Sequence, residues 1–141
     1  MCLFTQFFEE DGFDVAFENL PTAIAAMLND PGSAIFVAWH GVDPIGIATV
    51  TTTSQGLEFA RYAELEDLYV VPKARKIGIG GALVEQVKQW CQQIGCTVLA
   101  IVVTAEAQAN RNLIAHYQKQ GFQPSHRLTL FYHFNRQDLK L

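Results

Sequence analysis

The sequence predicts a mixed α/β fold in which one sheet carries helices on both of its faces, in a single domain that spans residues 1–141. Three observations support this. The first half contains short segments of β-forming residues separated by turns. The second half has the order strand, helix, strand. The chain is also half apolar and long enough to bury its own core.

The first half predicts two helices followed by three strands. Gly12 stops the first helix, and Pro21 opens the second. The turn "GVDP" joins two strands into a hairpin, and Pro72 ends a long third strand, "AELEDLYVV". The expected helices cover residues 2–10 and 22–30, and the expected strands cover 34–40, 45–53 and 63–71.

The second half predicts a helix, a strand, a helix and a strand. Apolar residues recur at helical spacing from Ala82 to Ile94, and Gly95 closes that helix. "CTVLAIVV" is a continuous apolar run, typical of a strand buried on both faces. The expected later elements are a helix over 105–120 that ends at Gly121, and a final alternating strand, "RLTLFYHF", over 127–134.

Charge is distributed unevenly between the two halves. Residues 1–72 hold eleven acids and one cation, for a net −10, whereas residues 73–141 hold nine cations and three acids, for a net +6. This asymmetry indicates two partners, a cationic one for the first half and an anionic one for the second. The alternative is that surface charge simply varies along the chain.

Several classes are not expected. No apolar run reaches the ~18 residues that span a bilayer, so we expect no membrane association. The three cysteines have neither disulfide-framework nor zinc-site spacing, so we expect no metal and a reducing, cytoplasmic compartment. The net charge of −4 and the lack of a basic–aromatic surface pattern argue against nucleic acid.

Three glycines mark an expected helix start in "VVPKARKIGIGGAL". A helix start carries free N–H groups and partial positive charge, which makes it an anion site. Gly78, Gly80 and Gly81 keep side chains away from those groups, and Arg75 and Lys76 add charge. The dinucleotide fingerprint and the P-loop both fail, because neither pattern is completed. The remaining alternative is a flexible turn with scattered charge.

"RKIGIGGAL" resembles the R/Q-x-x-G-x-G/A signature of the GNAT superfamily of acyl-CoA N-acyltransferases, and "NRNLIAHYQKQGF" resembles the second segment of that family. The resemblance covers roughly residues 34–134. It implies a central, mostly antiparallel sheet that splays between two parallel strands. The usual first strand of the family has no clear counterpart before "CLFTQFF".

The resemblance also implies a site for acetyl-CoA. Backbone N–H groups of the loop would hold the pyrophosphate of coenzyme A, and the end of the preceding strand would hold the pantetheine arm. Asn110 would contact the cofactor, and Tyr117 would lie beside the thioester sulfur. Leu113 and the pair Lys76-Ile77 depart from the usual pattern. The implied cofactor residues are Leu68, Tyr69, Val70, Arg75, Lys76, Ile77, Gly78, Ile79, Gly80, Gly81, Asn110 and Tyr117.

Direct acyl transfer to an amine needs a proton donor for the leaving thiolate and a proton acceptor for the amine. Tyr117 is the predicted acid; the alternative is an aromatic ring that merely packs beside Phe122. The predicted base is a strand carboxylate: Glu64 and Glu66 rank first, and Asp67 follows closely. Strict alternation places Glu64 and Glu66 on one face of the strand and Asp67 on the other.

The predicted activity is transfer of an acetyl group to a primary amine of a small cationic molecule or a protein. Glu9, Glu10, Asp11 and Asp14 fall where the family places its acceptor-binding elements, and they suit an aminoglycoside, a polyamine or a lysine side chain. The alternative is a non-catalytic acyl-CoA sensor or regulatory module. A homodimer is a further expectation from the family.

Overall fold

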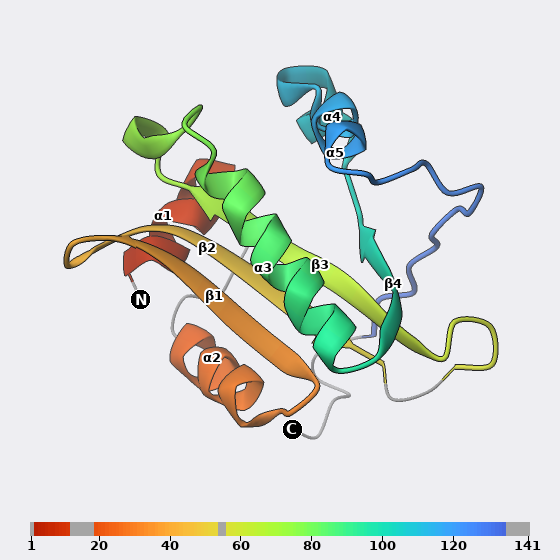
Figure 1. The fold of residues 1–141 in the computed structure, drawn as a ribbon. Helices are drawn as coiled ribbons and strands as arrows, with labels where there is room; N and C mark the ends of the chain where they lie inside the picture. Colours follow the sequence, from red (N-terminus) through yellow and green to blue (C-terminus); the bar gives the residue numbers. More distant parts are fainter. Residues whose placement is uncertain (1, 12–18, 54–55, 135–141) are drawn as a thin grey trace. The chain divides into compact units, whose positions relative to one another are not determined.

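The computed structural model describes residues 2–11, 19–53 and 56–134. The chain divides into two compact units, residues 1–103 and 104–141. The first unit contains a four-stranded sheet in the order β1-β2-β3-β4. Its strands are β1 (Ser33–His40), β2 (Asp43–Thr52), β3 (Arg61–Val70) and β4 (Cys96–Ile101). The first three are antiparallel neighbours, and β4 runs parallel to β3 (Figure 1). The predicted mixed sheet with helices is therefore confirmed.

The α-helices described in the first unit match the predicted positions. They are α1 (Cys2–Asp11), α2 (Leu20–Asn29) and α3 (Ile79–Gln93). The short 3-10 turn η2 (Pro72–Ala74) was not predicted. Pro21 lies in the first turn of α2, where its missing N–H costs no hydrogen bond. Gly95 follows α3 with a φ of 84°, the left-handed conformation that ends many helices.

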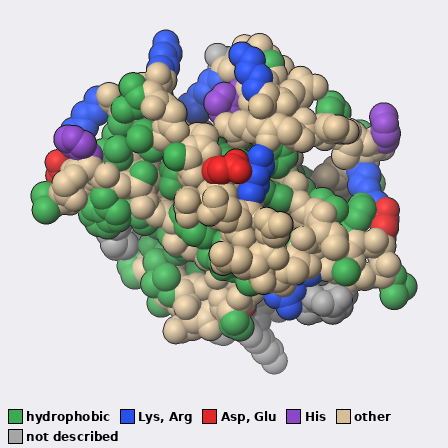
Figure 2. Space-filling model, viewed as in Figure 1, with side chains coloured by type: hydrophobic (Ala, Val, Ile, Leu, Met, Phe, Trp, Pro, Cys, Tyr) green, Lys and Arg blue, Asp and Glu red, His purple; other side chains and the backbone are tan. Residues whose placement is uncertain are grey.

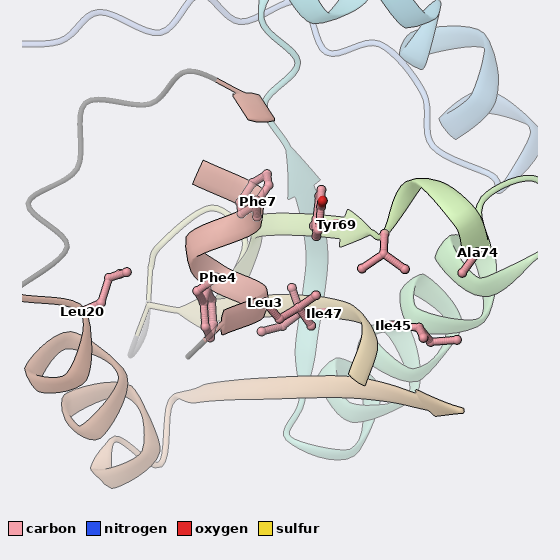
Figure 3. Close-up of a cluster of buried hydrophobic side chains, with 9 residues drawn as sticks. Leu3, Phe4, Phe7, Leu20, Ile45, Ile47, Tyr69 and Ala74 are labelled. Carbon is pink, nitrogen blue, oxygen red and sulfur yellow. The ribbon is translucent and has the colours of Figure 1, made fainter. Parts of the chain in front are cut away.

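The helices α1 and α3 cover opposite faces of the sheet. Ile45 and Ile47 of β2 share a buried cluster with the α1 side chains Leu3, Phe4 and Phe7 (Figure 3). Between them, Gly46 faces α3, because a Cβ there would lie 3.1 Å from Leu83 and 3.2 Å from Ile79. Successive strand residues point to opposite faces, so the two helices sandwich the sheet.

The second apolar layer lies under α3. Four of its side chains are buried at helical spacing, and α3 contacts β2, β3 and β4. The buried strand residues of the same unit include several small side chains, which let a helix approach the sheet closely. The helix contributes Leu83, Val84, Val87 and Cys91 to this layer. The buried residues of the strands include Ala48, Val50, Ala63 and Leu65.

The prediction that "CTVLAIVV" is buried on both faces is wrong. Five of the six residues of β4 are half-buried, and Thr97 is exposed. The reason is that β3 is the only strand paired with β4 among the described residues, so β4 is an edge strand.

The second unit differs from prediction in two places. The single helix expected over 105–120 is two helices, α4 (Ala105–Arg111) and α5 (Leu113–Lys119), because Asn112 adopts a left-handed φ of 48°. Asparagine reaches this conformation more readily than most residues. The strand expected over 127–134 is not formed, and its apolar side chains are exposed; Leu128 is 93% exposed and Phe131 is 75% exposed.

Within the described part of the chain, no helix is both long enough and apolar enough to span a membrane.

Candidate active site

The edge of β3 opens halfway along the strand. β3 and β4 pair from Arg61–Cys96 to Leu65–Ile101, and the later residues of β3 are paired only with β2. The resemblance predicted that the two parallel strands splay apart at the end of β3. Residues 68–70 lie in the part of β3 that is not paired with β4, where that splay is expected. Backbone groups on such an edge can form hydrogen bonds with an extended ligand as a further strand would.

The loop that follows β3 leads directly into α3. Arg75 is extended, and the next residue, Lys76, has a φ of 67°. Gly78 caps α3 with a φ of 92°, and no side chain forms a hydrogen bond to the cap. The first turn of α3 contains no acidic residue. The first turn of this helix therefore supplies no carboxylate of its own to offset the positive partial charge at its start.

The glycines of this loop leave room for a ligand. A Cβ added at Gly78 would meet no atom within 4 Å, so the left-handed φ, and not crowding by protein atoms, is what favours glycine there. A Cβ at Gly80 would meet only Val70, at an ordinary 3.8 Å. Ile77 is 71% exposed, whereas Ile79 packs against the core. These features fit an anion bound by backbone N–H groups.

The guanidinium of Arg75 is held by three groups of the same unit. Its Nε donates to the carbonyl of Val70 at 2.8 Å, and its Nη2 pairs with Glu10 at 2.7 Å. The guanidinium also lies over the ring of Tyr69, with 5.5 Å from Cζ to the ring centroid. Tyr69 in turn donates to the other carboxylate oxygen of Glu10 at 2.7 Å. Arg75 thus anchors the loop to both β3 and α1.

The three candidate carboxylates gather on one face of the sheet. Thr49 pairs with Asp67 while Val50 pairs with Leu65, so Glu66 is an extra residue, a β-bulge in β3. The hydroxyl of Thr49 donates to Asp67 at 2.5 Å. Bulges bend a strand and re-aim its side chains, which strict alternation does not anticipate.

Thr51 completes this arrangement. It lies opposite Glu64 in the register, and its hydroxyl donates to Glu66 at 2.8 Å. Thr49 and Thr51 are two residues apart on β2 and so share a face. That face is the one that also carries Ile47 and α1. The prediction that Asp67 points away from Glu64 and Glu66 is therefore wrong.

Burial and mutual repulsion alter the acidity of these groups. Burial raises the pKa of Glu64, and the charge of Glu66 raises it further. Burial also raises the pKa of Asp67; the hydrogen bond from Thr49 opposes that rise, and Glu66 adds to it. A carboxylate with a raised pKa is a stronger proton acceptor than an ordinary one.

An open cavity of about 850 Å³ lies on the α1 face of the first unit. α1, the start of β2, the end of β3 and η2 line it. Its walls are partly apolar, and its charged lining is Glu9, Glu10, Asp43 and Lys73. The charged lining of the cavity on the α1 face is therefore mostly acidic. By contrast, acidic side chains are sparse on the surface around α3 (Figure 2).

In the second unit, Tyr117 lies on α5 and is buried. Its ring contacts Phe122 edge to face at 5.7 Å, the packing that the alternative interpretation expected. Burial raises the pKa of its phenol, and Arg111 opposes that rise. The phenol therefore stays protonated at neutral pH, as a proton donor requires. His116 lies next to it, with 3.2 Å from its Nε2 to Gln120.

Some predicted residues cannot be compared with the structure. Asn110 lies in α4, but its side chain is outside the described residues, as is that of Asp11. Asp14 lies wholly outside the described residues.

The thiol of Cys91 is not activated. Burial raises the pKa of Cys91 to about 12, and neighbouring Cys96 adds to the rise. Its thiol is therefore protonated at neutral pH and a poor nucleophile. Among the described residues, no group of three or more His, Cys, Asp or Glu side chains could hold a metal ion.

Three residues of the candidate site were not predicted from the sequence. Thr49 and Thr51 form hydrogen bonds with the strand carboxylates, and Glu10 pairs with Arg75. The threonine-rich run "TVTTT" is also what an ordinary strand would contain, so it carried no separate signal. Glu10 and Arg75 are 65 residues apart, and no local pattern joins them.

Known proteins resemble this chain in sequence and in fold. The model of the acetyltransferase (GNAT) family matches residues 2–122. An aminoglycoside N(6')-acetyltransferase type 1 from Acinetobacter baumannii is 33% identical over 76 residues, which are 54% of this chain and 50% of that protein. The uncharacterized N-acetyltransferase YhfO from Bacillus subtilis is 29% identical over 100 residues, 71% of this chain and 65% of that protein.

The chain thus spans between half and about two thirds of the length of these relatives. Among solved structures, an integron cassette protein from the mobile metagenome of Cole Harbour Salt Marsh superimposes with a TM-score of 0.81 at 25% identity. That match covers 94% of this chain and 81% of the other.

Proposed function

Because the chain belongs to the acetyltransferase (GNAT) family, we propose that it transfers an acetyl group from acetyl-CoA to a primary amine of a small polycationic molecule. One observation carries the proposal: the open edge of β3 continues directly into the glycine loop and the uncapped start of α3. Coenzyme A has an extended pantetheine arm that leads to a diphosphate. The arm would lie along the open edge of β3, and the diphosphate would lie at the glycine loop and the start of α3. Backbone N–H groups from Arg75 to Gly81 would bind the diphosphate.

Acetyl-CoA supplies a thioester, whose carbonyl carbon the amine nitrogen attacks as the carbon–sulfur bond breaks. The residues of the chain would then handle two protons. A carboxylate of β3 accepts one from the amine, directly or through a water. Tyr117 gives its phenolic proton to the departing sulfur, a role that rests on its place in the second family segment and is supported by its raised pKa.

Glu64 and Asp67 are the better supported bases. Each has a raised pKa, and each lies on the face that carries α1. Glu66 would act mainly through its charge, which raises the pKa of both neighbours. An acidic surface also favours the approach of a cationic amine.

The choice of a polycationic acceptor rests on two grounds. Glu9, Glu10 and Asp43 line the cavity on the α1 face. The Acinetobacter relative is named for acetylation of aminoglycosides, which are polyamines, although the aligned part is half of that protein. A small molecule is therefore a better candidate than a protein lysine, and the aminoglycosides are the first compounds to try.

The test combines calorimetry with a turnover assay. Coenzyme A alone should release heat on binding and raise the melting temperature. A panel of aminoglycosides, polyamines and a lysine peptide, each given with acetyl-CoA, should release free thiol for at least one polycationic amine. Binding of coenzyme A with no thiol release across the panel would favour the sensor alternative. Absence of binding would remove the proposal altogether.

A further inference from the structure

The glycine loop is fixed at its first residue by a side chain from the other end of the first unit. Glu10, in the last turn of α1, uses both carboxylate oxygens: one pairs with Arg75 at 2.7 Å and the other accepts from Tyr69 at 2.7 Å. The side chains of Arg75 and Glu10 are 34% and 31% exposed, so water only partly screens the pair. Tyr69 itself is held by the core, with its ring 5.2 Å from that of Phe7.

The loop beyond Arg75 has a shape that its own sequence does not favour. Lys76 has a φ of 67°, a left-handed conformation that is unfavourable for a non-glycine residue. Such strain persists only where surrounding contacts determine the backbone. The side chain of Arg75, immediately before Lys76, contacts Glu10, Val70 and Tyr69, and its backbone N–H donates to the carbonyl of Pro72 at 3.3 Å.

The charge of Glu10 alone would work against an anion. A carboxylate near an anion-binding loop repels a diphosphate, so a purely electrostatic view predicts tighter binding when Glu10 is removed. A positioning role predicts the opposite, because the released Arg75 would leave the loop and the N–H groups of α3 poorly aligned. The two effects have opposite signs and can be separated by experiment.

We propose that Glu10 is a positioning residue for the diphosphate of coenzyme A, acting through Arg75 and without touching the ligand. This inference rests on the proposed coenzyme A site. α1 would then contribute to the binding of coenzyme A as well as line the cavity proposed for the amine.

The experiment compares Glu10→Ala and Glu10→Gln with the wild type and with Glu85→Gln, a control that removes the same charge from α3. Glu85 pairs with Lys88 at 3.6 Å and lies in the middle of α3, away from its first turn. Calorimetry measures the affinity for coenzyme A. Kinetics at saturating concentration of the most active amine of the panel compare acetyl-CoA with acetyl-pantetheine, which lacks the diphosphate. Saturation keeps any effect of Glu10 on amine binding out of the comparison.

We expect Glu10→Ala to weaken coenzyme A binding about tenfold and to lower kcat/KM for acetyl-CoA, with little change for acetyl-pantetheine. Glu10→Gln should show a smaller loss, and Glu85→Gln should match the wild type. In combination with Arg75→Ala, the Glu10→Ala change should add little, because the two residues act as one unit.

Three results would overturn the inference and leave the proposed function intact: unchanged or tighter coenzyme A binding in the Glu10 variants, an equal loss with both thioesters, or full additivity with Arg75→Ala. If Glu10→Ala fails to fold, Tyr69→Phe replaces it, since that change removes only the hydroxyl that holds Glu10. It should weaken coenzyme A binding in the same direction, and unchanged binding would count against the inference. Failure of the wild type to bind coenzyme A would instead remove the proposed function itself, and this inference with it.

Discussion

Thr49 on β2 donates a hydrogen bond of 2.5 Å to the carboxylate of Asp67 on β3, and Thr49 is fully buried. A carboxylate in such surroundings is costly to ionise, and its pKa is accordingly raised. This pair lies directly beside the bulge at Glu66. The centre of the sheet therefore holds a charge that stability alone would not favour, which is typical of functional sites.

Asp67→Asn should stabilise the protein at neutral pH. The pKa of Asp67 is higher in the folded protein than in the unfolded chain, so the folded state binds the proton more tightly. Stability then falls as pH rises from the unfolded pKa through the folded one. Asparagine keeps an acceptor for Thr49 and carries no charge. The melting temperature of the variant should exceed that of the wild type at pH 7, and the difference should shrink as pH falls towards the unfolded pKa of about 4.

Asp30→Asn is the control with the opposite sign. The N–H of Gly32 and the hydroxyl of Ser33 lower the pKa of Asp30, so its ionised form is favoured by folding. That stabilisation is present above the unfolded pKa and is lost as pH falls. Asp30→Asn should therefore lower the melting temperature at pH 7. A rise for both variants would show that loss of negative charge in general, and not burial of Asp67, explains the first result.

Glu66→Gln should shift the pH dependence of catalysis towards acid. The base must be ionised, so kcat/KM rises with pH through its pKa. The charge of Glu66 raises the pKa of both Glu64 and Asp67. Removing it should move the acid limb to lower pH whichever of the two is the base, while the plateau stays within about threefold of wild type. Loss of the plateau by 10²-fold or more would identify Glu66 itself as the base.

Gly78→Ala should weaken coenzyme A binding through the backbone. The φ of 92° disfavours alanine, although its Cβ would meet no atom within 4 Å. We expect a loss of stability of about 1 kcal/mol and about tenfold weaker binding by calorimetry. Gly41→Ala is the matched control, since Gly41 also has a positive φ, 62°, and open space around it, but lies in the β1–β2 turn. Equal loss of affinity in both variants would contradict a role for the loop.

Tyr117→Phe should lower kcat about 10- to 10²-fold and leave coenzyme A affinity unchanged, because it removes only the proton that the phenol donates. The ring and its edge-to-face contact with Phe122 remain, so the melting temperature should change little. Rates under saturating acetyl-CoA and amine measure the effect. An unchanged kcat would show that Tyr117 is not the proton donor and that its ring only packs beside Phe122.

Local patterns predicted most of the first unit. The β-forming residues of β1 and β2, the turn at Gly41 and the helical spacing of α3 all depend on residues close in sequence. The glycine loop before α3 could be predicted for the same reason, since its glycines and cations lie within a few residues of each other. Its role as an anion site stays a prediction.

The features that were missed depend on contacts distant in sequence or on backbone detail. The bulge at Glu66 appears only in the register between β2 and β3, and it reversed the predicted orientation of Asp67. Alternation in "RLTLFYHF" predicted a strand, but a strand also needs a paired neighbour, and that segment has none among the described residues. The left-handed conformation of Asn112 divided a segment whose composition favoured one helix.

The contact between α1 and β3 has a consequence for the order of folding. α1 has only 10 residues, and an isolated helix of that length is marginal in water. It leaves the ribosome before its packing partners Ile45, Ile47 and Tyr69 have been synthesised. α1 therefore becomes stable only after β3 has emerged. Slow-synthesis or pulse-labelling experiments should find the amide hydrogens of α1 exchanging freely until that moment.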